Sequence, residues 1–273
     1  MINKKIITIL ASMALVSSIS IGCSKKTEDV NSVTISGSTS VGPLIEKEAE
    51  AFKTSTPDIN IQVNQLGSSA GIKDAINGTV QVGMTSRDLK EDEKSQGLKE
   101  VEIAYDGIAL ITNKSNSIKS LSLSQIKDIY TGKIKNWKEI GGKDVPIVVV
   151  SREDGSGTRD SFQEKVGYKS EELTQEAQIA DGSGNIKSLV STNENAIGFI
   201  SFEYLDDSIN VLQVDKVEPT AKNVLDKAYK ISRPFLLVYK EDKVTENAKK
   251  FIDFILSEEG QKVVEDNGLI KIK

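Results

Sequence analysis

Three short loops rich in glycine, serine and threonine are the parts of this sequence best suited to bind an anion. They are Gly37-Ser38-Thr39-Ser40, Gly67-Ser68-Ser69-Ala70-Gly71 and Asp154-Gly155-Ser156-Gly157-Thr158. Each precedes a helical pattern, and the first backbone N–H groups of a helix are unpartnered and partly positive. Hydroxyls add donors, and glycine lets the backbone approach closely. Any one loop is also an ordinary helix cap, so the three together predict an oxyanion site.

Arg152 adds a permanent positive charge just before the third loop. Its guanidinium is a planar fork of donors that can bind two phosphate oxygens at once. Asp154, two residues later, could hold this arginine in position or accept a proton from a protonated anion. The sequence therefore predicts a site in which hydroxyls, backbone N–H groups and one arginine act together.

The chain has 273 residues, no histidine and one cysteine. Catalytic machinery built on histidine, His-ligated metals, zinc clusters and internal disulfides are therefore excluded. The second loop matches the G-x-S-x-G pattern of hydrolases, but no histidine exists to activate Ser69. No G-x-x-x-x-G-K-[ST] pattern is present, so the loops are not a nucleotide P-loop. We expect no catalytic residue, no metal site and no cofactor.

Strand-like and helix-like segments alternate along the chain, which favours an α/β fold with mostly parallel sheets. In such folds ligands bind at the carboxyl ends of strands, where strand-to-helix loops lie. Strands are expected at residues 33–35, 59–63, 107–112, 146–150, 196–201 and 235–239. Helices are expected at residues 44–53, 160–166 and 245–266, among others, the last ended by Gly268.

Residues 1–22 have the pattern of a signal peptide, with Lys4 and Lys5 before an apolar stretch. The only cysteine, Cys23, follows directly, which resembles a bacterial lipobox except that Ser20 stands where leucine is usual. We expect lipidation at Cys23 and a polar tether over residues 23–30; the alternative is a plain signal peptide cleaved nearby.

Cleavage removes two lysines, leaving 33 basic and 40 acidic residues, a net charge of −7. That charge disfavours nucleic-acid binding.

The sequence resembles the phosphate-binding protein of bacterial phosphate ABC importers, the PstS type, from about Val33 to Ile272. The most specific segments are Gly37–Ser40, Leu66–Ile72, Ile126–Trp137 and Arg152–Thr158. Ile126–Trp137 looks structural and is given no ligand role. The resemblance implies a two-lobed, Venus-flytrap fold of the type II periplasmic-binding kind, with a mostly parallel central sheet in each lobe. It also implies that an anion is buried in the cleft between the lobes.

Carried over position by position, the resemblance implies a set of phosphate contacts from both lobes. One wall would come from the first two loops and the other from Arg152 and the loop that follows it. Ser38 would add a further hydroxyl. The expected contacts are Ser38, Thr39, Ser40, Ser68, Arg152, Ser156, Gly157 and Thr158, with Asp154 in support.

The chain departs from the family pattern after residue 82, where relatives place an aspartate that accepts the proton of bound phosphate. Here Ser86 stands at that position and Arg87 follows. Because sulfate carries no proton, such an acceptor favours phosphate over sulfate. The acceptor here could be Ser86, another hydroxyl or Asp154. Arg87 could add a second positive contact to the anion or pair with Asp88 at the surface.

We expect the chain to cross between lobes near residues 111–114 and 230–234. Lobe I would comprise residues 31–112 and 231–273, and lobe II residues 113–230. Arg233 is expected to be a hinge or structural residue. Tyr105 and Asp106 would either lie at the rim of the cleft or pack in the hinge.

These observations predict a monomeric, lipid-anchored extracytoplasmic receptor that captures inorganic phosphate and delivers it to the permease of an ABC importer. Three alternatives remain open. The first is a receptor of the same fold for sulfate, molybdate or tungstate. The second is a secreted phosphate-ester enzyme, and the third is an adhesin or signalling lipoprotein that has lost ligand binding.

Overall fold

The computed structural model describes residues 31–272. The predicted signal peptide at residues 1–22, the lipidation site Cys23 and the tether at residues 23–30 lie outside the described residues. Within the described part of the chain, no helix is long and apolar enough to cross a membrane.

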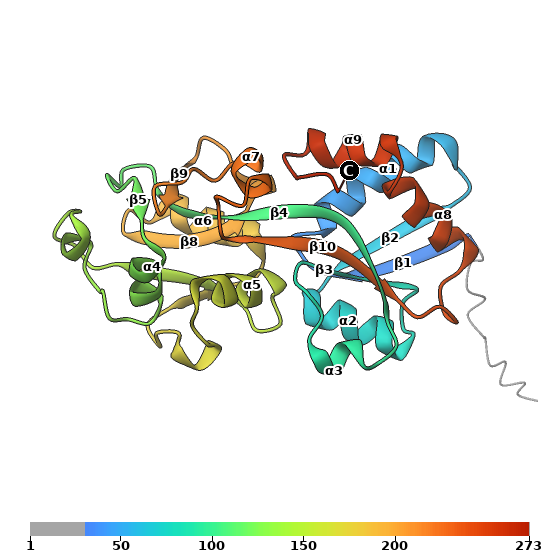
Figure 1. The fold of residues 1–273 in the computed structure, drawn as a ribbon, viewed down its shortest axis with the longest axis horizontal. Helices are drawn as coiled ribbons and strands as arrows, with labels where there is room; N and C mark the ends of the chain where they lie inside the picture. Colours follow the sequence, from blue (N-terminus) through green and yellow to red (C-terminus); the bar gives the residue numbers. More distant parts are fainter. Residues whose placement is uncertain (1–30, 273) are drawn as a thin grey trace, which may run out of the picture. The chain divides into compact units, whose positions relative to one another are not determined.

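Ten strands in the described residues form one continuous sheet (Figure 1). Its order is β2-β1-β3-β10-β4-β8-β6-β7, while β9 pairs with β4 and β5. The strands are β1 (Ser32–Gly37), β2 (Asn60–Gln65), β3 (Val82–Thr85), β4 (Lys99–Asn113), β5 (Ser120–Leu121), β6 (Val148–Arg152), β7 (Gln178–Ala180), β8 (Ala196–Ser201), β9 (Ile209–Val214) and β10 (Ser232–Tyr239).

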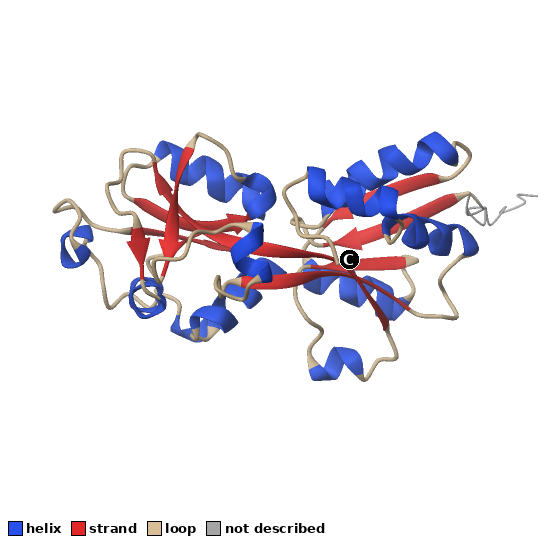
Figure 2. Cartoon of the chain, turned by 45° about the horizontal axis from the view of Figure 1, so that its top comes forward, coloured by secondary structure: helices blue, strands red, loops and turns tan. Residues whose placement is uncertain are grey.

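Helices lie on both sides of the strands (Figure 2). The α-helices are α1 (Gly42–Ser55), α2 (Ser68–Asn77), α3 (Glu91–Lys94), α4 (Leu123–Tyr130), α5 (Gly157–Val166), α6 (Gly182–Thr192), α7 (Ala221–Leu225), α8 (Glu246–Ile255) and α9 (Glu258–Asp266). Three short 3₁₀ helices are η1 (Trp137–Ile140), η2 (Ser170–Glu172) and η3 (Phe202–Tyr204). The α/β fold predicted from the sequence is confirmed.

Two hydrophobic clusters divide the described chain into two lobes. One runs from Val33 to Ala104 and returns from Phe235 to Leu269, with a small satellite cluster beside α2; we call the residues around it lobe I. The other runs from Ile108 to Ile231 and defines lobe II. The chain therefore passes between the clusters along β4 and again just before and within β10.

Parallel and antiparallel strand pairs occur in different parts of the sheet. In lobe I, β1 pairs in parallel with β2 and β3; in lobe II, β6 pairs in parallel with β7 and β8. Every antiparallel pair between named strands of the described residues involves β4 or β10. Parallel neighbours need crossover helices, which α1 and α2 supply, whereas the two long strands run against their neighbours and join the lobes.

Two expected elements differ from the structure. The predicted strand at residues 107–112 is the second half of the longer β4. Its first half pairs with β10 and, through one bridge at Tyr105, with Ile270, and it carries several exposed polar residues. The predicted helix at residues 245–266 is two helices, α8 and α9. The break is fixed by Ser257, whose Oγ caps α9 by accepting the Gly260 N–H.

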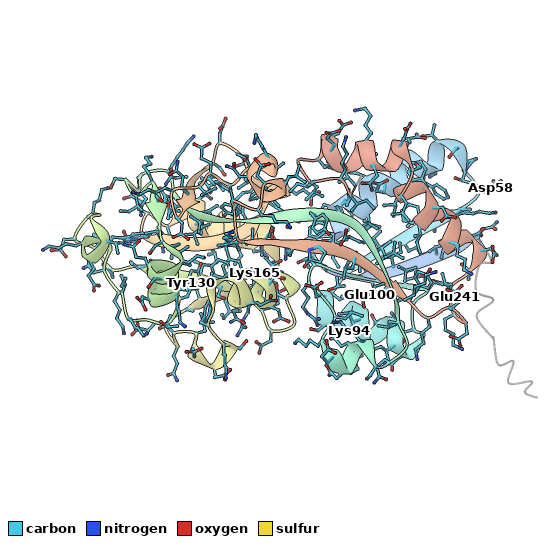
Figure 3. The ribbon with its side chains drawn as sticks, in the orientation of Figure 1. Asp58, Lys94, Glu100, Tyr130, Lys165 and Glu241 are labelled. Atoms are coloured by element: carbon cyan, nitrogen blue, oxygen red, sulfur yellow. The ribbon has the colours of Figure 1, made fainter. Side chains whose placement is uncertain are left out.

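An aromatic cluster fixes the orientation of α5 in lobe II. Phe162 of α5 stacks on Phe199 of β8 with ring centroids 4.0 Å apart, and Tyr130 of α4 packs against its edge at 4.9 Å. Tyr130 is buried, whereas the charged Asp58 and Glu241 labelled with it in Figure 3 are exposed. The Ile126–Trp137 segment thus supports the helix whose N-terminus carries the third loop.

Glu48 of α1 is a buried carboxylic acid in lobe I. Its side chain is fully buried, and neither carboxylate oxygen has a hydrogen-bond partner among the described residues. Burial, together with the negative charge of Glu259, raises the pKa of Glu48 to about 8. An unpartnered buried carboxyl avoids the cost of desolvating a charge by staying protonated.

We predict that Glu48→Gln stabilises the protein more at alkaline than at acidic pH. Between the usual pKa of 4.5 and the raised value of about 8, the folded protein binds more protons than the unfolded chain. The free energy of unfolding therefore falls as pH rises through this window, by at most about 1.4 kcal/mol per pH unit for one group. Glutamine does not titrate, so the difference in the midpoint temperature of unfolding between variant and parent should grow from about pH 5 to about pH 9.

Calorimetric unfolding at both pH values measures this difference. Glu50→Gln is the matched control, because it removes the same carboxylate from an exposed position on the same helix. An equal midpoint shift for Glu48→Gln at both pH values would show that this carboxyl is already ionised in the folded protein.

Candidate anion-binding site

The predicted loops lie where strands end and helices begin. Gly37 ends β1. Glycine is required there because φ is +143° and because a Cβ would lie only 2.0 Å from the Met84 carbonyl oxygen. Gly71 is equally constrained, since a Cβ there would lie 2.3 Å from the Ser36 carbonyl oxygen. These glycines let α2 and the Ser38–Ser40 turn pack directly on the strands. The first two loops are thereby held side by side in lobe I.

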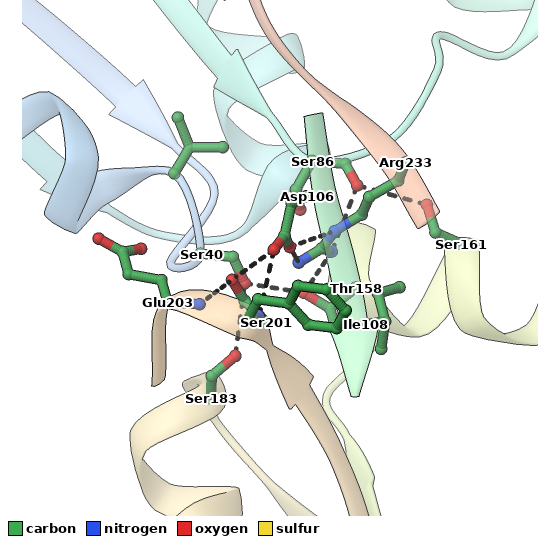
Figure 4. A network of polar contacts seen from close by, with 12 residues as sticks. Ser40, Ser86, Asp106, Ile108, Thr158, Ser161, Ser183, Ser201, Glu203 and Arg233 are labelled. Carbon is green, nitrogen blue, oxygen red and sulfur yellow. Dashed lines mark hydrogen bonds and ion pairs between the residues drawn. The ribbon is translucent and has the colours of Figure 1, made fainter. Parts of the chain in front are cut away.

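A cluster of hydroxyl groups lies between the lobes. Ser38 Oγ donates to Ser86 Oγ at 2.9 Å, and Ser68 Oγ lies 3.3 Å from the same atom. Ser40 Oγ of lobe I lies 2.8 Å from Thr158 Oγ1 of lobe II (Figure 4). All five side chains are at most 2% exposed. The structure therefore brings hydroxyls from three separate chain segments of lobe I to the N-terminus of α5.

The start of α5 shows why the third loop contains Ser156 and Gly157. Ser156 is the N-cap, and its Oγ accepts the Arg159 N–H at 3.3 Å. A Cβ on Gly157 would lie 2.3 Å from Ser68 Oγ and 2.8 Å from Ser86 Oγ. Only glycine allows the hydroxyls of lobe I to approach the α5 N-terminus this closely.

Arg152 reaches from lobe II to lobe I at this cluster. It is 1% exposed, and its Nη2 donates to Thr39 Oγ1 at 2.8 Å. Glu153 holds the guanidinium through two hydrogen bonds of 2.7 Å, from Nε and Nη2. Arg152 Nη1 lies 3.5 Å from Ser183 Oγ. The guanidinium is thus oriented by a carboxylate and directed at the hydroxyl cluster.

Glu153, rather than the predicted Asp154, holds Arg152 in position, and this corrects the expectation. β6 ends at Arg152, and the turn at Asp154 and Gly155, where φ is +81°, directs the aspartate to solvent. The Asp154 side chain is 95% exposed and pairs with Arg159 Nη1 at 2.6 Å. Asp154 is therefore not placed to accept a proton from an anion among the buried hydroxyls.

Arg87 does not direct its guanidinium into the hydroxyl cluster, which corrects both interpretations weighed for it. Its two Nη atoms donate to the carboxylate of Glu93 at 2.7 and 2.8 Å, and its Nε lies 3.0 Å from Asp160 Oδ2. Arg87 contacts Asp88 only through the backbone carbonyl. The side chain is 4% exposed, so it is no surface pair. Ser86, one residue earlier, does belong to the cluster.

A buried ion pair lies beneath the cluster, on the two strands that join the lobes. Arg233 of β10 binds Asp106 Oδ2 of β4 through Nη2 at 2.8 Å and Nε at 3.1 Å. Arg233 Nη1 also donates to Thr158 Oγ1 at 2.6 Å, and Asp106 Oδ1 accepts from Ser201 Oγ at 3.0 Å (Figure 4). Burial raises the pKa of Asp106, and Arg233 opposes that rise. Arg233 thus joins the two crossing strands and also positions Thr158.

Two further lobe II residues at the site were not predicted. Ser183, in the first turn of α6, is fully buried with its Oγ 3.4 Å from Ser40 Oγ. The sequence signal was present, because Asp181-Gly182-Ser183-Gly184 is a fourth loop of the same composition before a helix. Tyr204 of η3 donates its OH to the Thr39 carbonyl at 3.1 Å, a contact between lobes without a sequence signature.

The site as a whole offers neutral hydroxyls, the α5 N-terminus and two arginines, each of which is paired with a carboxylate. Within the described residues, no group of three or more acidic or cysteine side chains could hold a metal ion. The hydroxyls can both donate and accept hydrogen bonds, which suits a partly protonated oxyanion. The arrangement therefore gathers donors suited to an oxyanion at the buried contact between the lobes.

The chain is similar in sequence and in fold to known proteins. The family model described as the PBP superfamily domain matches residues 24–259. The phosphate-binding protein PstS of Bacillus subtilis is 38% identical over 245 residues, covering 88% of this chain and 81% of the relative. PstS of Borreliella burgdorferi is 29% identical over 259 residues, covering 91% of this chain and 93% of the relative.

Two solved structures are similar over nearly the whole described chain. A putative phosphate ABC transporter substrate-binding protein with bound phosphate, from Clostridium perfringens, is 70% identical with a TM-score of 0.88; the match covers 89% of this chain and 100% of that one. An ABC-type phosphate transport receptor from Vibrio cholerae is 37% identical with a TM-score of 0.76, covering 87% and 99%. The two-lobed fold is thereby confirmed, and this chain belongs to the PBP superfamily and, within it, to the PstS family of phosphate-binding proteins.

Proposed function

We propose that this protein captures inorganic phosphate between its lobes and delivers it to the permease of an ABC importer. The observation that carries the proposal is the buried meeting of Arg152, the lobe I hydroxyls and the α5 N-terminus across the lobe boundary. Uncharged donors and an oriented arginine can replace the hydration shell of an anion. The relatives named PstS and the solved structure with bound phosphate support this choice of anion.

The proposed phosphate contacts are the predicted ones without Arg87, which is engaged by carboxylates, and without a supporting role for Asp154. Hydroxyls that contact one another across the lobe boundary can rotate to donate to an anion held there. Release then requires the lobes to open, because the site is almost fully buried. The contact set is Ser38, Thr39, Ser40, Ser68, Ser86, Arg152, Ser156, Gly157 and Thr158.

We propose that Ser86 accepts the proton of bound phosphate. The resemblance to the family places it at the position of an aspartate, and its Oγ already accepts a hydrogen bond from Ser38 at 2.9 Å. Asp154, the other acidic candidate, faces solvent and pairs with Arg159. A hydroxyl acceptor is uncharged and therefore weaker than a carboxylate, so discrimination against sulfate should be present but smaller than an aspartate would give.

The remaining features of the proposal concern placement and domain limits. We propose cleavage after residue 22, lipidation of Cys23, an extracytoplasmic location and a monomeric state. Peptide mass spectrometry of the membrane-extracted protein would identify the modified N-terminus.

We also propose lobe limits at residues 31–112 with 231–273 and at 113–230. The two core clusters support a division into two lobes, but they place the first crossing between Ala104 and Ile108 and the return between Ile231 and Phe235.

Calorimetric titration of phosphate-free protein tests the proposed ligand. Phosphate should bind one to one, and sulfate at equal concentration should not displace it. Effective competition by sulfate, molybdate or tungstate would favour a receptor for another oxyanion. Turnover of a phosphate ester would favour the enzyme alternative, for which the hydroxyls lack a neighbouring histidine base.

We predict that Arg152→Ala weakens phosphate binding by about 2 kcal/mol or more, which is roughly 30-fold in Kd. The substitution removes a charge-assisted contact and leaves Glu153 without its cationic partner. Calorimetry measures the change. Lys165→Ala is the control. It also removes one positive charge from lobe II, but Lys165 lies on α5 and pairs with Glu164. An unchanged Kd in Arg152→Ala would exclude this arginine from direct contact with the anion.

We predict that Ser86→Ala reduces the preference for phosphate over sulfate by about tenfold, since a neutral hydrogen bond contributes roughly 1 to 1.5 kcal/mol. Phosphate loses an acceptor for its proton, whereas sulfate has no proton to donate. Competition titrations with both anions give the ratio. Ser69→Ala serves as the control, since Ser69 contacts Arg87 rather than the hydroxyl cluster. A preserved ratio in Ser86→Ala would assign proton acceptance to another hydroxyl.

A further inference from the structure

An ion pair links the two lobes outside the hydroxyl cluster. Arg87 follows β3 in lobe I, and Asp160 lies on α5 in lobe II. Arg87 Nε lies 3.0 Å and Lys90 Nζ 3.3 Å from the same atom, Asp160 Oδ2. The Arg87 N–H is not aligned for a hydrogen bond with that oxygen, so the attraction is one of charge.

The Arg87 guanidinium is held by contacts within lobe I. Both Nη atoms of Arg87 are bound by Glu93, which belongs to the same lobe, and Nη1 also donates to the Asp88 carbonyl at 2.9 Å. The side chain is 4% exposed. Because the guanidinium is already ordered within lobe I, its pairing with Asp160 costs little additional conformational entropy.

The ion pair is coupled by chain connectivity to the phosphate contacts. Arg87 directly follows Ser86, and Asp160 lies two residues after Thr158 on the first turns of α5. Ser161 Oγ also donates to the Ser86 carbonyl at 3.3 Å, between the ion pair and the cluster. The pair can therefore form only when Ser86 reaches the α5 N-terminus, which is the arrangement that encloses the anion.

We propose that Asp160 is a positioning residue for phosphate binding: its pairing with Arg87 and Lys90 stabilises the closed arrangement of the lobes and raises affinity without contact to the anion. This inference rests on the proposed capture of an anion between the lobes. It gives Arg87, which the sequence suggested as a possible ligand, a role in closure instead.

The surroundings of the pair set its expected strength. It borders a surface hollow of about 340 Å³ that Gln163 and Tyr168 also line. Asp160 is 24% exposed and Lys90 is 57% exposed, so solvent and salt reach the contact. Partly exposed ion pairs are weak and screened by salt. We therefore expect a loss of about threefold to tenfold in affinity when the pair is removed, shrinking at high ionic strength.

The charge of Asp160 also acts on the anion directly, in the opposite direction. Asp160 is a negative charge two residues from Thr158, and an unscreened carboxylate repels an anion. If repulsion dominated, removal of the charge would tighten binding. If closure dominates, removal weakens binding. The sign of the change in Kd therefore separates the two effects.

The experiment compares Asp160→Asn with the parent and with Glu164→Gln. Glu164 lies one turn later on α5, borders the same hollow and pairs only with Lys165, so its substitution makes the same charge change without touching the lobe contact. Phosphate Kd is measured by calorimetry and the dissociation rate by stopped flow, at low and high salt. Asp160→Asn should raise Kd about threefold to tenfold at low salt, mainly through faster dissociation. Glu164→Gln should stay within about twofold.

An unchanged or lower Kd in Asp160→Asn at low salt would overturn the inference. Arsenate provides a second readout: since Asp160 does not touch the anion, the fold loss should be equal for phosphate and arsenate, and unequal losses would place Asp160 in direct contact instead. Failure of the proposed function is seen separately in the parent protein. If the parent binds another oxyanion but not phosphate, Asp160→Asn and Glu164→Gln are compared with that anion. A higher Kd in Asp160→Asn then supports the closure role, and an unchanged or lower Kd overturns it.

Discussion

The buried pair of Arg233 and Asp106 is the interaction on which the rest of the site depends. Each residue lies on one of the two strands that join the lobes, and both side chains are at most 2% exposed. Loss of either partner would leave a buried charge uncompensated, which is strongly destabilising. Because Arg233 also binds Thr158 and Asp106 also binds Ser201, the crossing strands and lobe II are held in one network.

Charge balance around this pair explains how an acidic protein can hold an anion. Arg152 and Arg233 are each matched by a carboxylate of the protein, Glu153 and Asp106, which orients the guanidinium and limits its cost of burial. The added anion then meets oriented donors rather than a large positive field. Selectivity should therefore depend on hydrogen-bond geometry and on the hydroxyl acceptors more than on long-range attraction.

The sequence predicted those parts of the site that loop composition and the alternation of elements reveal, namely the hydroxyl loops and the α/β fold. The contacts that require Gly37 and Gly71, with the Met84 and Ser36 carbonyls, join segments distant in the chain. The pairing of Arg87 with Asp160 could not be predicted, since Asp160 is also distant in the chain and meets Arg87 only after folding. Glu153 was missed because the turn at Gly155 decides which of two neighbouring acids faces Arg152. The break at Ser257 was missed because a continuous helical pattern hides a cap.

We propose that phosphate is held by the hydroxyl cluster and Arg152, while Arg87 stays with Glu93 and with Asp160 of the other lobe. A crystal structure of the protein grown with phosphate tests this most directly. Our account predicts one phosphate between the lobes, within hydrogen-bond distance of Arg152 and Thr158, with Arg87 still bound to Glu93 and Asp160. A phosphate bound elsewhere, or an Arg87 guanidinium turned onto the anion, would contradict it.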